Sequence, residues 1–308
     1  MGTMCQHGNE ETHKMSQSTP TIVAADAGTV QLGDRTVSRL GFGAMRITGK
    51  GIWGPPADRN AALATLRRVV ELGVNFIDTA DSYGPYVSEE LIAEALAPYP
   101  AGLVIGTKGG WERTGPGQWI HNASPKHLQE AVEGSLKRLR LSQIDLFQLH
   151  IPDPAVSFDA SIETLARLRE QGKIRHLGLS NVTLEHVERA RKIVPIVSVQ
   201  NRYSFADREW DFLLNHCEQK GIAFIPWAPL GQNRQGNELL ERAAKELTWT
   251  PLQVALAWLL RRSSVMLPIP GTSSAAHAEE NIRAAGLKLP DAWFKELSEV
   301  NPPPASLR

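Results

Sequence analysis

Four side chains that suit proton transfer to a carbonyl oxygen follow short apolar segments of this chain. Asp78 and Tyr83 stand just past one such segment, Lys108 ends the next, and His150 ends a later one. A phenol has an unperturbed pKa of about 10, which makes it a poor proton donor at neutral pH. An ammonium held by a carboxylate stabilises the phenolate and lowers that pKa. The four residue types therefore predict a tyrosine that is tuned to protonate a carbonyl oxygen.

Lys108 also permits a different chemistry, because lysines form Schiff bases with carbonyl substrates. Asp78 favours the first interpretation, since a paired carboxylate keeps the lysine protonated, which suits phenolate stabilisation and not nucleophilic attack. Each residue could instead have a packing role, such as a loop tyrosine or a histidine hydrogen-bonded beneath a loop. The shared pattern, and not any one residue, indicates a site.

The stretch Asp-Thr-Ala-Asp-Ser-Tyr-Gly over residues 78–84, the Val-Ile-Gly-Thr-Lys and Phe-Gln-Leu-His strand ends, and the Gly-Leu-Ser-Asn motif over residues 178–181 resemble the aldo-keto reductases. The resemblance runs from about residue 31 to about residue 290 and rests on several motifs in the same order. It implies an eight-stranded α/β barrel and NADPH-linked reduction of an aldehyde or ketone by hydride transfer. Tyr83 would then be the proton donor, and His150 would orient the carbonyl group.

A nicotinamide cofactor carries a carboxamide, which uncharged serine, asparagine and glutamine side chains can bind. The chain has no Gly-x-Gly-x-x-Gly fingerprint, so a Rossmann site is not indicated. By resemblance, Trp227 would stack on the nicotinamide, although core packing is its other interpretation. The residues that we expect to bind the cofactor are Met45, Ser180, Asn181, Gln200, Trp227, Pro229, Leu230, Gly231, Arg234, Gly271, Thr272, Ser273, His277, Glu280 and Asn281.

One departure from the family concerns the adenosine 2′-phosphate. The family commonly places a lysine and an arginine after the eighth strand, where this chain has Gly271 and His277. Thr272, Ser273 and the start of the following helix remain as neutral partners for an anion. NADPH is still expected in preference to NADH, although the usual bidentate arginine contact is missing.

Loops that follow the strands of a barrel shape its substrate pocket. Here they contain Arg46, Trp53, Trp111 and Trp119, which predict a flat or aromatic substrate unless the tryptophans only pack the loops. Arg202 is a further candidate to meet a phenolic oxygen of the substrate. The motif Gly-Ala-Met-Arg-Ile-Thr-Gly over residues 43–49 looks most like the bacterial pyridoxal reductase branch, which implies reduction of pyridoxal to pyridoxine.

The elements that position these residues alternate between short apolar strands and amphipathic helices. This alternation fits either a doubly wound sheet or a barrel. Polar residues at the ends of five strands favour a barrel, whose strand ends ring one mouth. We therefore predict a single (β/α)8 TIM barrel over residues 29–308, an N-terminal β-hairpin over Val30–Val37, and a flexible tail over residues 1–28. The resemblance to the aldo-keto reductases implies that this hairpin closes the bottom of the barrel. The predicted strands are Leu40–Ala44, Phe76–Asp78, Leu103–Thr107, Leu146–Leu149, His176–Leu179, Ile196–Val199, Ala223–Pro226 and Met266–Ile269.

The overall composition limits the partners. The 33 basic and 33 acidic residues give a formal net charge of zero, which argues against a nucleic-acid or anionic-membrane partner. No apolar run is long enough to cross a membrane. The two cysteines suggest a reducing, cytoplasmic setting, and the scattered histidines predict no metal site.

Two alternatives of other classes stay open beside a reductase of small carbonyl compounds. One is a nucleotide-binding regulatory protein like a potassium-channel β-subunit, which shares the fold and the four residues. Steady NADPH turnover with aldehydes would argue against it. The other is a Schiff-base lyase, which borohydride would trap on Lys108. The sequence indicates neither the oligomeric state nor the favoured direction of reaction.

Overall fold

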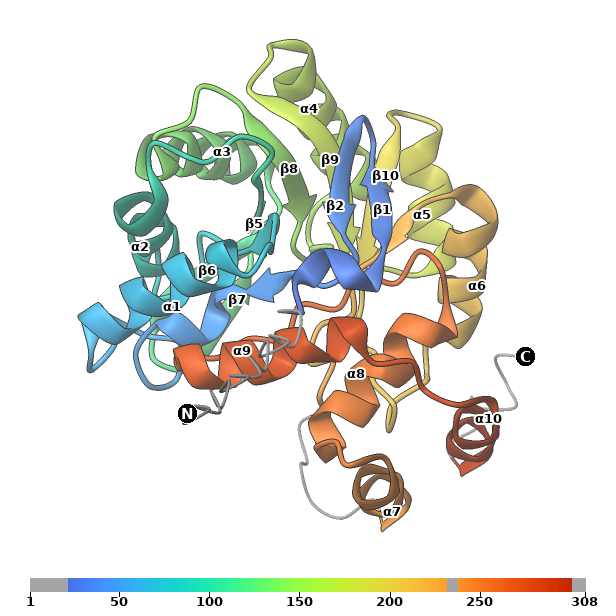
Figure 1. Cartoon of the computed structure of the whole chain (residues 1–308). Coiled ribbons are helices and arrows are strands. Elements are labelled where there is room, and N and C mark those ends of the chain that lie inside the picture. Colours follow the sequence, from blue (N-terminus) through green and yellow to red (C-terminus); the bar gives the residue numbers. More distant parts are fainter. Residues whose placement is uncertain (1–21, 232–237, 301–308) are drawn as a thin grey trace, which may run out of the picture.

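The computed structural model describes residues 22–231 and 238–300, and a curved sheet of seven parallel strands lies at the centre of this part of the chain (Figure 1). The strands follow the order β11-β10-β9-β8-β5-β4-β3 across the sheet. Their bounds are β3 (Phe42–Gly43), β4 (Phe76–Asp78), β5 (Val104–Gly109), β8 (Ile144–Leu149), β9 (Ile174–Ser180), β10 (Ile196–Gln200) and β11 (Ala223–Phe224). Each overlaps one of the first seven predicted strands. Their near-continuous burial is typical of parallel strands that are covered on both faces.

The segment predicted as the eighth strand, Met266–Ile269, lies between the two edges of this sheet. The backbone N–H of Leu267 donates to the carbonyl oxygen of Phe224 at 2.8 Å, and the N–H of Gly41 donates to that of Pro268 at 2.9 Å. These contacts close the barrel, which confirms the predicted fold. The segment forms a bridge and not a full strand, because Pro268 has no N–H to give to a ladder.

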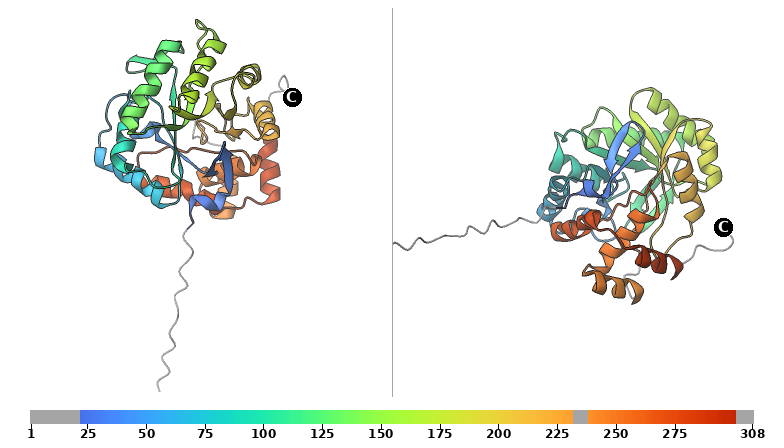
Figure 2. Two further views of the ribbon diagram at one scale, coloured as in Figure 1. Left: turned by 90° about the horizontal axis from the view of Figure 1, so that it is seen from above. Right: turned by 45° about the vertical axis from the view of Figure 1, so that its right-hand side comes forward.

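Helices cover the outside of the barrel, as two further views show (Figure 2). Several begin where the sequence places a capping residue: the side chains of Asp58, Ser124, Thr183 and Thr250 each accept a backbone N–H of the first turn. The helices are α1 (Arg59–Glu71), α2 (Val87–Leu96), α3 (Pro125–Leu139), α4 (Phe158–Glu170), α5 (Leu184–Arg191), α6 (Asp211–Lys220), α7 (Glu238–Leu247), α8 (Pro251–Arg262), α9 (Ala275–Arg283) and α10 (Asp291–Val300), with short 3-10 turns η2 (Ala44–Ile47) and η3 (Ala284–Gly286).

Two β-hairpins sit at opposite ends of the barrel. The predicted hairpin consists of β1 (Thr29–Leu32) and β2 (Arg35–Ser38) (Figure 1). Its apolar side chains pack with those of the barrel strands. The second consists of β6 (Trp111–Gly115) and β7 (Gln118–His121), between β5 and α3. The sequence analysis expected only a loop there. Most side chains of this second hairpin are exposed or half-buried, so it lacks the apolar alternation that marks a strand.

The predicted tail over residues 1–28 requires a correction at its C-terminal end. Ala24–Ala27 form a 3-10 turn, η1, and Ala24 is fully buried. The N–H of Ala24 donates to the carbonyl oxygen of Leu72 at 2.9 Å, which ties this turn to the end of α1. The ordered fold therefore begins before residue 29. Residues 1–21 lie outside the described part of the chain.

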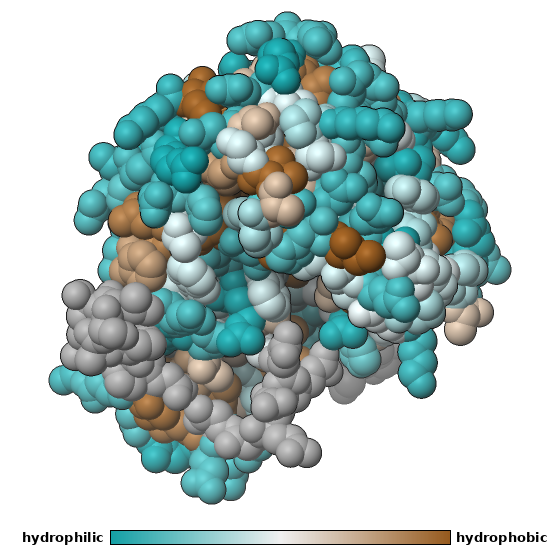
Figure 3. All heavy atoms as spheres, turned by 180° about the vertical axis from the view of Figure 1, so that it is seen from behind, coloured by the Kyte–Doolittle hydropathy of each residue, from teal (hydrophilic) through white to brown (hydrophobic). Residues whose placement is uncertain are grey.

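One face of the described part of the chain can be followed in a space-filling view. The face opposite to the view of Figure 1 is mostly hydrophilic, with hydrophobic residues scattered over its described part (Figure 3). Within residues 22–231 and 238–300, no helix has both the length and the apolar character needed to cross a membrane.

Candidate active site

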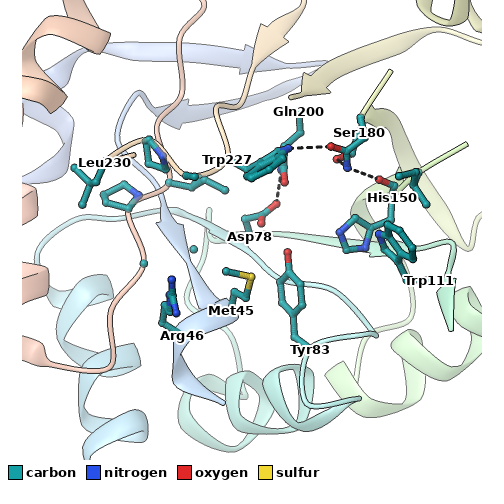
Figure 4. A pocket seen from close by; sticks show the side chains of 18 of the residues that line it. Met45, Arg46, Asp78, Tyr83, Trp111, His150, Ser180, Gln200, Trp227 and Leu230 are labelled. Atoms are coloured by element: carbon teal, nitrogen blue, oxygen red, sulfur yellow. Dashed lines mark hydrogen bonds between the residues drawn. The ribbon is translucent and has the colours of Figure 1, made fainter. Parts of the chain in front are cut away.

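A cavity of about 710 Å³ opens at the carboxyl ends of the barrel strands (Figure 4). It brings together residues from strands and loops that lie far apart in the sequence, as expected for the mouth of a barrel. Its lining consists of Gly43, Met45, Arg46, Asp78, Tyr83, Trp111, Trp119, His150, Ile151, Ser180, Asn181, Gln200, Trp227, Ala228, Pro229, Leu230, Gly231, Ile269, Pro270 and Gly271.

Asp78, Tyr83 and Lys108 form one hydrogen-bonded group at the bottom of the cavity. The Lys108 Nζ atom donates to Asp78 Oδ2 at 2.6 Å, to the carbonyl oxygen of Thr79 at 2.8 Å and to the Tyr83 hydroxyl at 3.5 Å. Lys108 is completely buried beneath the lining. The three side chains that the sequence singled out are therefore in contact with one another.

The second oxygen of Asp78 is also occupied. Asp78 Oδ1 accepts from Gln200 Nε2 at 2.8 Å and from Gln148 Nε2 at 3.2 Å. The sequence analysis assigned Gln200 to the cofactor and did not assign Gln148 to the site. A polar residue within the buried Leu146–Leu149 run of β8 was the available signal for Gln148, which is fully buried. Both amides fix the orientation of the carboxylate that holds Lys108.

The pKa of Lys108 agrees with the expectation from the sequence, and the pKa of Tyr83 differs from it. Burial alone would lower the pKa of Lys108, but its interactions with Asp78 and Tyr83 outweigh this effect, so the pKa is raised and the ammonium persists. Burial raises the pKa of Tyr83 above its usual value, and the opposing effect of Lys108 is smaller. The predicted depression of the Tyr83 pKa is therefore not present in the structure. Desolvation of the phenolate is the reason.

His150 faces Tyr83 across the cavity. The two ring centroids are 5.9 Å apart in an edge-to-face arrangement, and Trp111 lies 6.3 Å from the same imidazole. Burial lowers the pKa of His150 far below its usual value, and the charge of Lys108 adds to this effect. The imidazole is therefore neutral at neutral pH. Its Nδ1 atom lies 3.4 Å from the hydroxyl of Ser82, a neighbour that the sequence analysis did not identify.

The side chains predicted to bind a nicotinamide ring also line the cavity. Asn181 donates from Nδ2 to the carbonyl oxygen of His150 at 3.0 Å and accepts from Trp227 Nε1 at 3.0 Å. It also contacts the hydroxyl of Ser180 at 3.1 Å. These bonds orient the indole of Trp227 at the cavity surface. The donor set is uncharged, and it suits a carboxamide placed beside the ring.

The remaining predicted cofactor residues divide into those that line the cavity and those that lie beyond it. Met45, Pro229, Leu230, Gly231 and Gly271 belong to its lining. Beyond Gly271 the chain leads to α9, whose start is capped by the hydroxyl of Ser274. Five predicted cofactor residues around this start do not belong to the cavity lining: Thr272, Ser273, His277, Glu280 and Asn281. Arg234 lies outside the described residues.

Arg46 lies beside Gly271. A Cβ atom built on Gly271 would be 3.7 Å from Arg46 Cγ, and the same Cβ would clash with the carbonyl oxygen of Gly43 at 2.5 Å. Figure 4 shows Arg46 and Met45 on one side of Tyr83, and His150 and Trp111 on the other. The residue that the sequence analysis assigned to the substrate therefore stands next to the predicted cofactor residues.

Two of the predicted substrate residues have other neighbours. Trp53 is absent from the cavity lining and lies 5.5 Å from the guanidinium of Arg113, in the segment that pairs with Gly84. Arg202 forms an ion pair with Asp207 at 2.5 Å and is also outside the lining. The lining therefore does not include these two predicted substrate residues, which contact Arg113 and Asp207 instead. Trp111 and Trp119 line it as predicted, with ring centroids 5.7 Å apart.

Comparisons with known proteins agree with this geometry. A family model described as "Aldo/keto reductase family" matches residues 39–302. An uncharacterized oxidoreductase of Schizosaccharomyces pombe is 50% identical over 280 residues, which cover 90% of this chain and 91% of that protein. Pyridoxine 4-dehydrogenase of Escherichia coli is 44% identical over 282 residues, which cover 89% and 99% of the two chains. An aldo/keto reductase of Klebsiella pneumoniae, solved in complex with NADP and acetate, is similar at a TM-score of 0.77 and 26% identity, covering 90% of this chain and 96% of that one.

Proposed function

Because the chain belongs to the aldo/keto reductase family, we propose that it is an NADPH-dependent reductase of small aldehydes or ketones. The observation that carries this proposal is the buried contact between Asp78, Lys108 and Tyr83 at the floor of a cavity that His150 also lines. A bound nicotinamide would supply the hydride. The side chains supply the proton and the electrostatic environment.

In the proposed reaction Tyr83 gives its phenolic proton to the carbonyl oxygen as negative charge develops there. Burial disfavours the resulting phenolate, so the reaction depends on the positive charge of Lys108 within 3.5 Å of the hydroxyl. Asp78 keeps that charge in place. Neutral His150 can donate one hydrogen bond to the same carbonyl oxygen without being protonated itself.

The uncharged wall formed by Ser180, Asn181, Gln200 and Trp227 supports the binding of a nicotinamide beside Tyr83. Gln200 gives one N–H to Asp78, so its carbonyl oxygen and its second N–H are left for a carboxamide. We propose NADPH in preference to NADH. The Klebsiella pneumoniae structure in complex with NADP supports this choice.

Arg46 supports the same assignment by its position beside Gly271. Gly271 occupies the place where the family commonly has a cation. We propose that Arg46 supplies the missing positive charge to a phosphate of the cofactor, and that it does not bind the substrate. Arg46→Met should therefore raise the Kd for NADPH while leaving the KM ratio between different aldehydes unchanged.

We further propose that the substrate is an aromatic aldehyde of the pyridoxal type. Trp111 and Trp119 give the cavity flat apolar surface for stacking. The relative from Escherichia coli is a pyridoxine 4-dehydrogenase. A Schiff-base lyase is less well supported, because the raised pKa of Lys108 keeps its nitrogen protonated and unable to attack a carbonyl carbon.

The test is steady-state consumption of NADPH and of NADH with a panel of carbonyl compounds that includes pyridoxal, an aromatic aldehyde without a phenol, glucose and a steroid ketone. We expect turnover with NADPH and the highest kcat/KM for pyridoxal or the other aromatic aldehyde. Tyr83→Phe is the matched control, and it should lose roughly a hundred- to ten-thousand-fold in kcat with NADPH affinity nearly unchanged. A parent enzyme that binds NADPH without turning it over would favour a regulatory protein, and trapping by borohydride would favour a lyase.

A further inference from the structure

The guanidinium of Arg113, on β6, joins three segments around the mouth of the barrel. Its Nη1 atom donates to the carbonyl oxygen of Ser82 at 2.9 Å and to that of Ile52 at 3.1 Å. Its Nε atom donates to the carbonyl oxygen of Gln118, on β7, at 2.9 Å. One side chain therefore holds the segment around Ile52, the loop that carries Tyr83 and the β6–β7 hairpin together.

The same guanidinium lies against two tryptophans. Its central carbon is 3.7 Å from the ring centroid of Trp119 and 5.5 Å from that of Trp53. Trp119 lines the cavity, whereas Arg113 and Trp53 are outside the lining. Arg113 therefore supports the aromatic wall of the cavity from the side that faces away from the ligand space. A planar guanidinium can stack in this way and still donate in its own plane, which an ammonium cannot do.

Ser82 connects this contact to the reacting groups. It precedes Tyr83 in the chain, and its hydroxyl lies 3.4 Å from His150 Nδ1. The carbonyl group that Arg113 holds is thus part of the peptide unit that leads into Tyr83. Any rotation of this peptide would move the phenol and the histidine contact together.

The partners of Arg113 also differ from those of an ordinary structural arginine. Within the described ranges its contacts are backbone carbonyl groups and aromatic rings, and none is a carboxylate. Burial lowers its pKa, and no acidic neighbour offsets this effect. Removing the guanidinium would therefore leave no unpaired carboxylate behind. A neutral residue at position 113 can therefore test the role of Arg113 without leaving a buried charge unpaired.

We infer that Arg113 is a positioning residue, which sets the Trp111–Trp119 wall and the Tyr83 loop relative to each other so that a stacked aromatic aldehyde meets the phenol. This inference rests on the proposed function. It predicts that the wall and the proton donor are coupled: a substrate that contacts the wall depends on Arg113 for both binding and turnover. A short aliphatic aldehyde, which cannot stack, depends on it for turnover alone.

The experiment compares Arg113→Met and Arg113→Lys with the parent enzyme, using benzaldehyde and propanal as substrates. Arg113→Met should lower kcat roughly tenfold or more for both aldehydes, because small displacements of reacting groups cost this much. It should raise KM severalfold for benzaldehyde only. Arg113→Lys keeps the charge and the donors, so it should recover part of kcat while KM for benzaldehyde stays high.

Arg35→Met is the matched control. It removes an arginine that binds Asp145 at the opposite end of the barrel, and it should lower the Tm without changing the KM ratio of the two aldehydes. A purely structural Arg113 would behave like this control, with a lower Tm and equal effects on both substrates, and that outcome would overturn the inference. If Arg113→Met did not fold, Arg113→Lys alone would decide: an unchanged KM ratio would reject a role for planar stacking.

The result also separates this inference from the proposed function. A parent enzyme that reduces aldehydes normally, with Arg113 variants indistinguishable from it, would reject only the role of Arg113. A parent enzyme that reduces neither aldehyde, and is equally inactive with pyridoxal, would reject the proposed function and the inference with it.

Discussion

The two hairpins of this protein have the same secondary structure but are fastened to the barrel in different ways. At the bottom, ion pairs hold the β1–β2 hairpin: Arg35 binds Asp145 at 2.7 Å, and Asp34 binds both Arg175 and His176. At the mouth, the β6–β7 hairpin is held by Arg113 through backbone carbonyl groups and indole rings. One end uses opposite charges, and the other uses a single cation among neutral groups.

The difference agrees with what each end encloses. The bottom hairpin fills the barrel with buried side chains, such as Leu32 and Val37, so its ion pairs need only hold it in place. The mouth hairpin borders an open cavity, where fixed orientation of rings and backbone matters for a ligand. The contacts that fix the bottom hairpin should therefore contribute to stability, and the contacts that fix the mouth hairpin should contribute to the chemistry of the site. Four predictions test this division.

The largest effect is expected from Lys108→Met at the mouth. The Tyr83 phenolate would lose the cation that offsets its burial, so kcat should fall roughly a hundred- to ten-thousand-fold. Asp78→Asn should cost less, because the ammonium remains bonded to the carbonyl oxygen of Thr79. Steady-state kinetics would check both, with circular dichroism to confirm folding. A larger loss for Asp78→Asn than for Lys108→Met would mean that the two roles are misassigned.

A cation added at the mouth should change ligand affinity and not folding. His277→Arg places a guanidinium on the exposed face near the start of α9, where the resemblance to the family led us to expect one. A charge-assisted hydrogen bond contributes about 1.5–3 kcal/mol. The Kd for NADPH should therefore fall by roughly tenfold to a hundredfold, and the Kd for NADH should change little. Fluorescence titration would measure both constants. Equal changes would place His277 away from the 2′-phosphate.

At the bottom of the barrel, Arg35→Met should act on stability alone. The pair between Arg35 and Asp145 is partly exposed, so its loss should lower the free energy of unfolding by about 1 kcal/mol. The Tm should fall by a few degrees, as measured by calorimetry. The values of kcat and KM should match the parent. A changed KM for any aldehyde would break the proposed division between the two ends.

The smallest expected effect concerns the stability of the protein at low pH. Hydrogen bonds from Arg175 and His176 hold the pKa of Asp34 well below its usual range. A carboxylate whose pKa is lower in the folded state than in the unfolded state contributes stability at neutral pH, and this contribution fades as pH falls below about 5. Because Asp34 is more than half exposed, we expect only about 0.2–1 kcal/mol. Denaturant unfolding of Asp34→Asn should show this deficit at pH 7 and a smaller one at pH 3. A constant deficit would exclude the ionised carboxylate as its source.

Much of the fold could be predicted because its signals are local. Apolar strands such as Phe76–Asp78 and helix caps such as Ser124 depend on neighbouring residues only. The β6–β7 hairpin escaped prediction because its residues alternate little in polarity and its stability comes from contacts such as that of Arg113 with Ser82. The eighth strand was predicted in place, but Pro268 limits it to a bridge.

The candidate site divides in the same way. The sequence by itself singled out the candidate reacting set, because Asp78, Tyr83, Lys108 and His150 each lie at or just beyond the carboxyl end of a strand and parallel strand ends must meet at one mouth. Only the tertiary structure decided which neighbours tune them. It bonded Gln148 and Gln200 to Asp78, placed Arg46 beside Gly271, and placed Trp53 against Arg113. These contacts join residues that are distant in the chain, and their geometry depends on packing that no local pattern encodes.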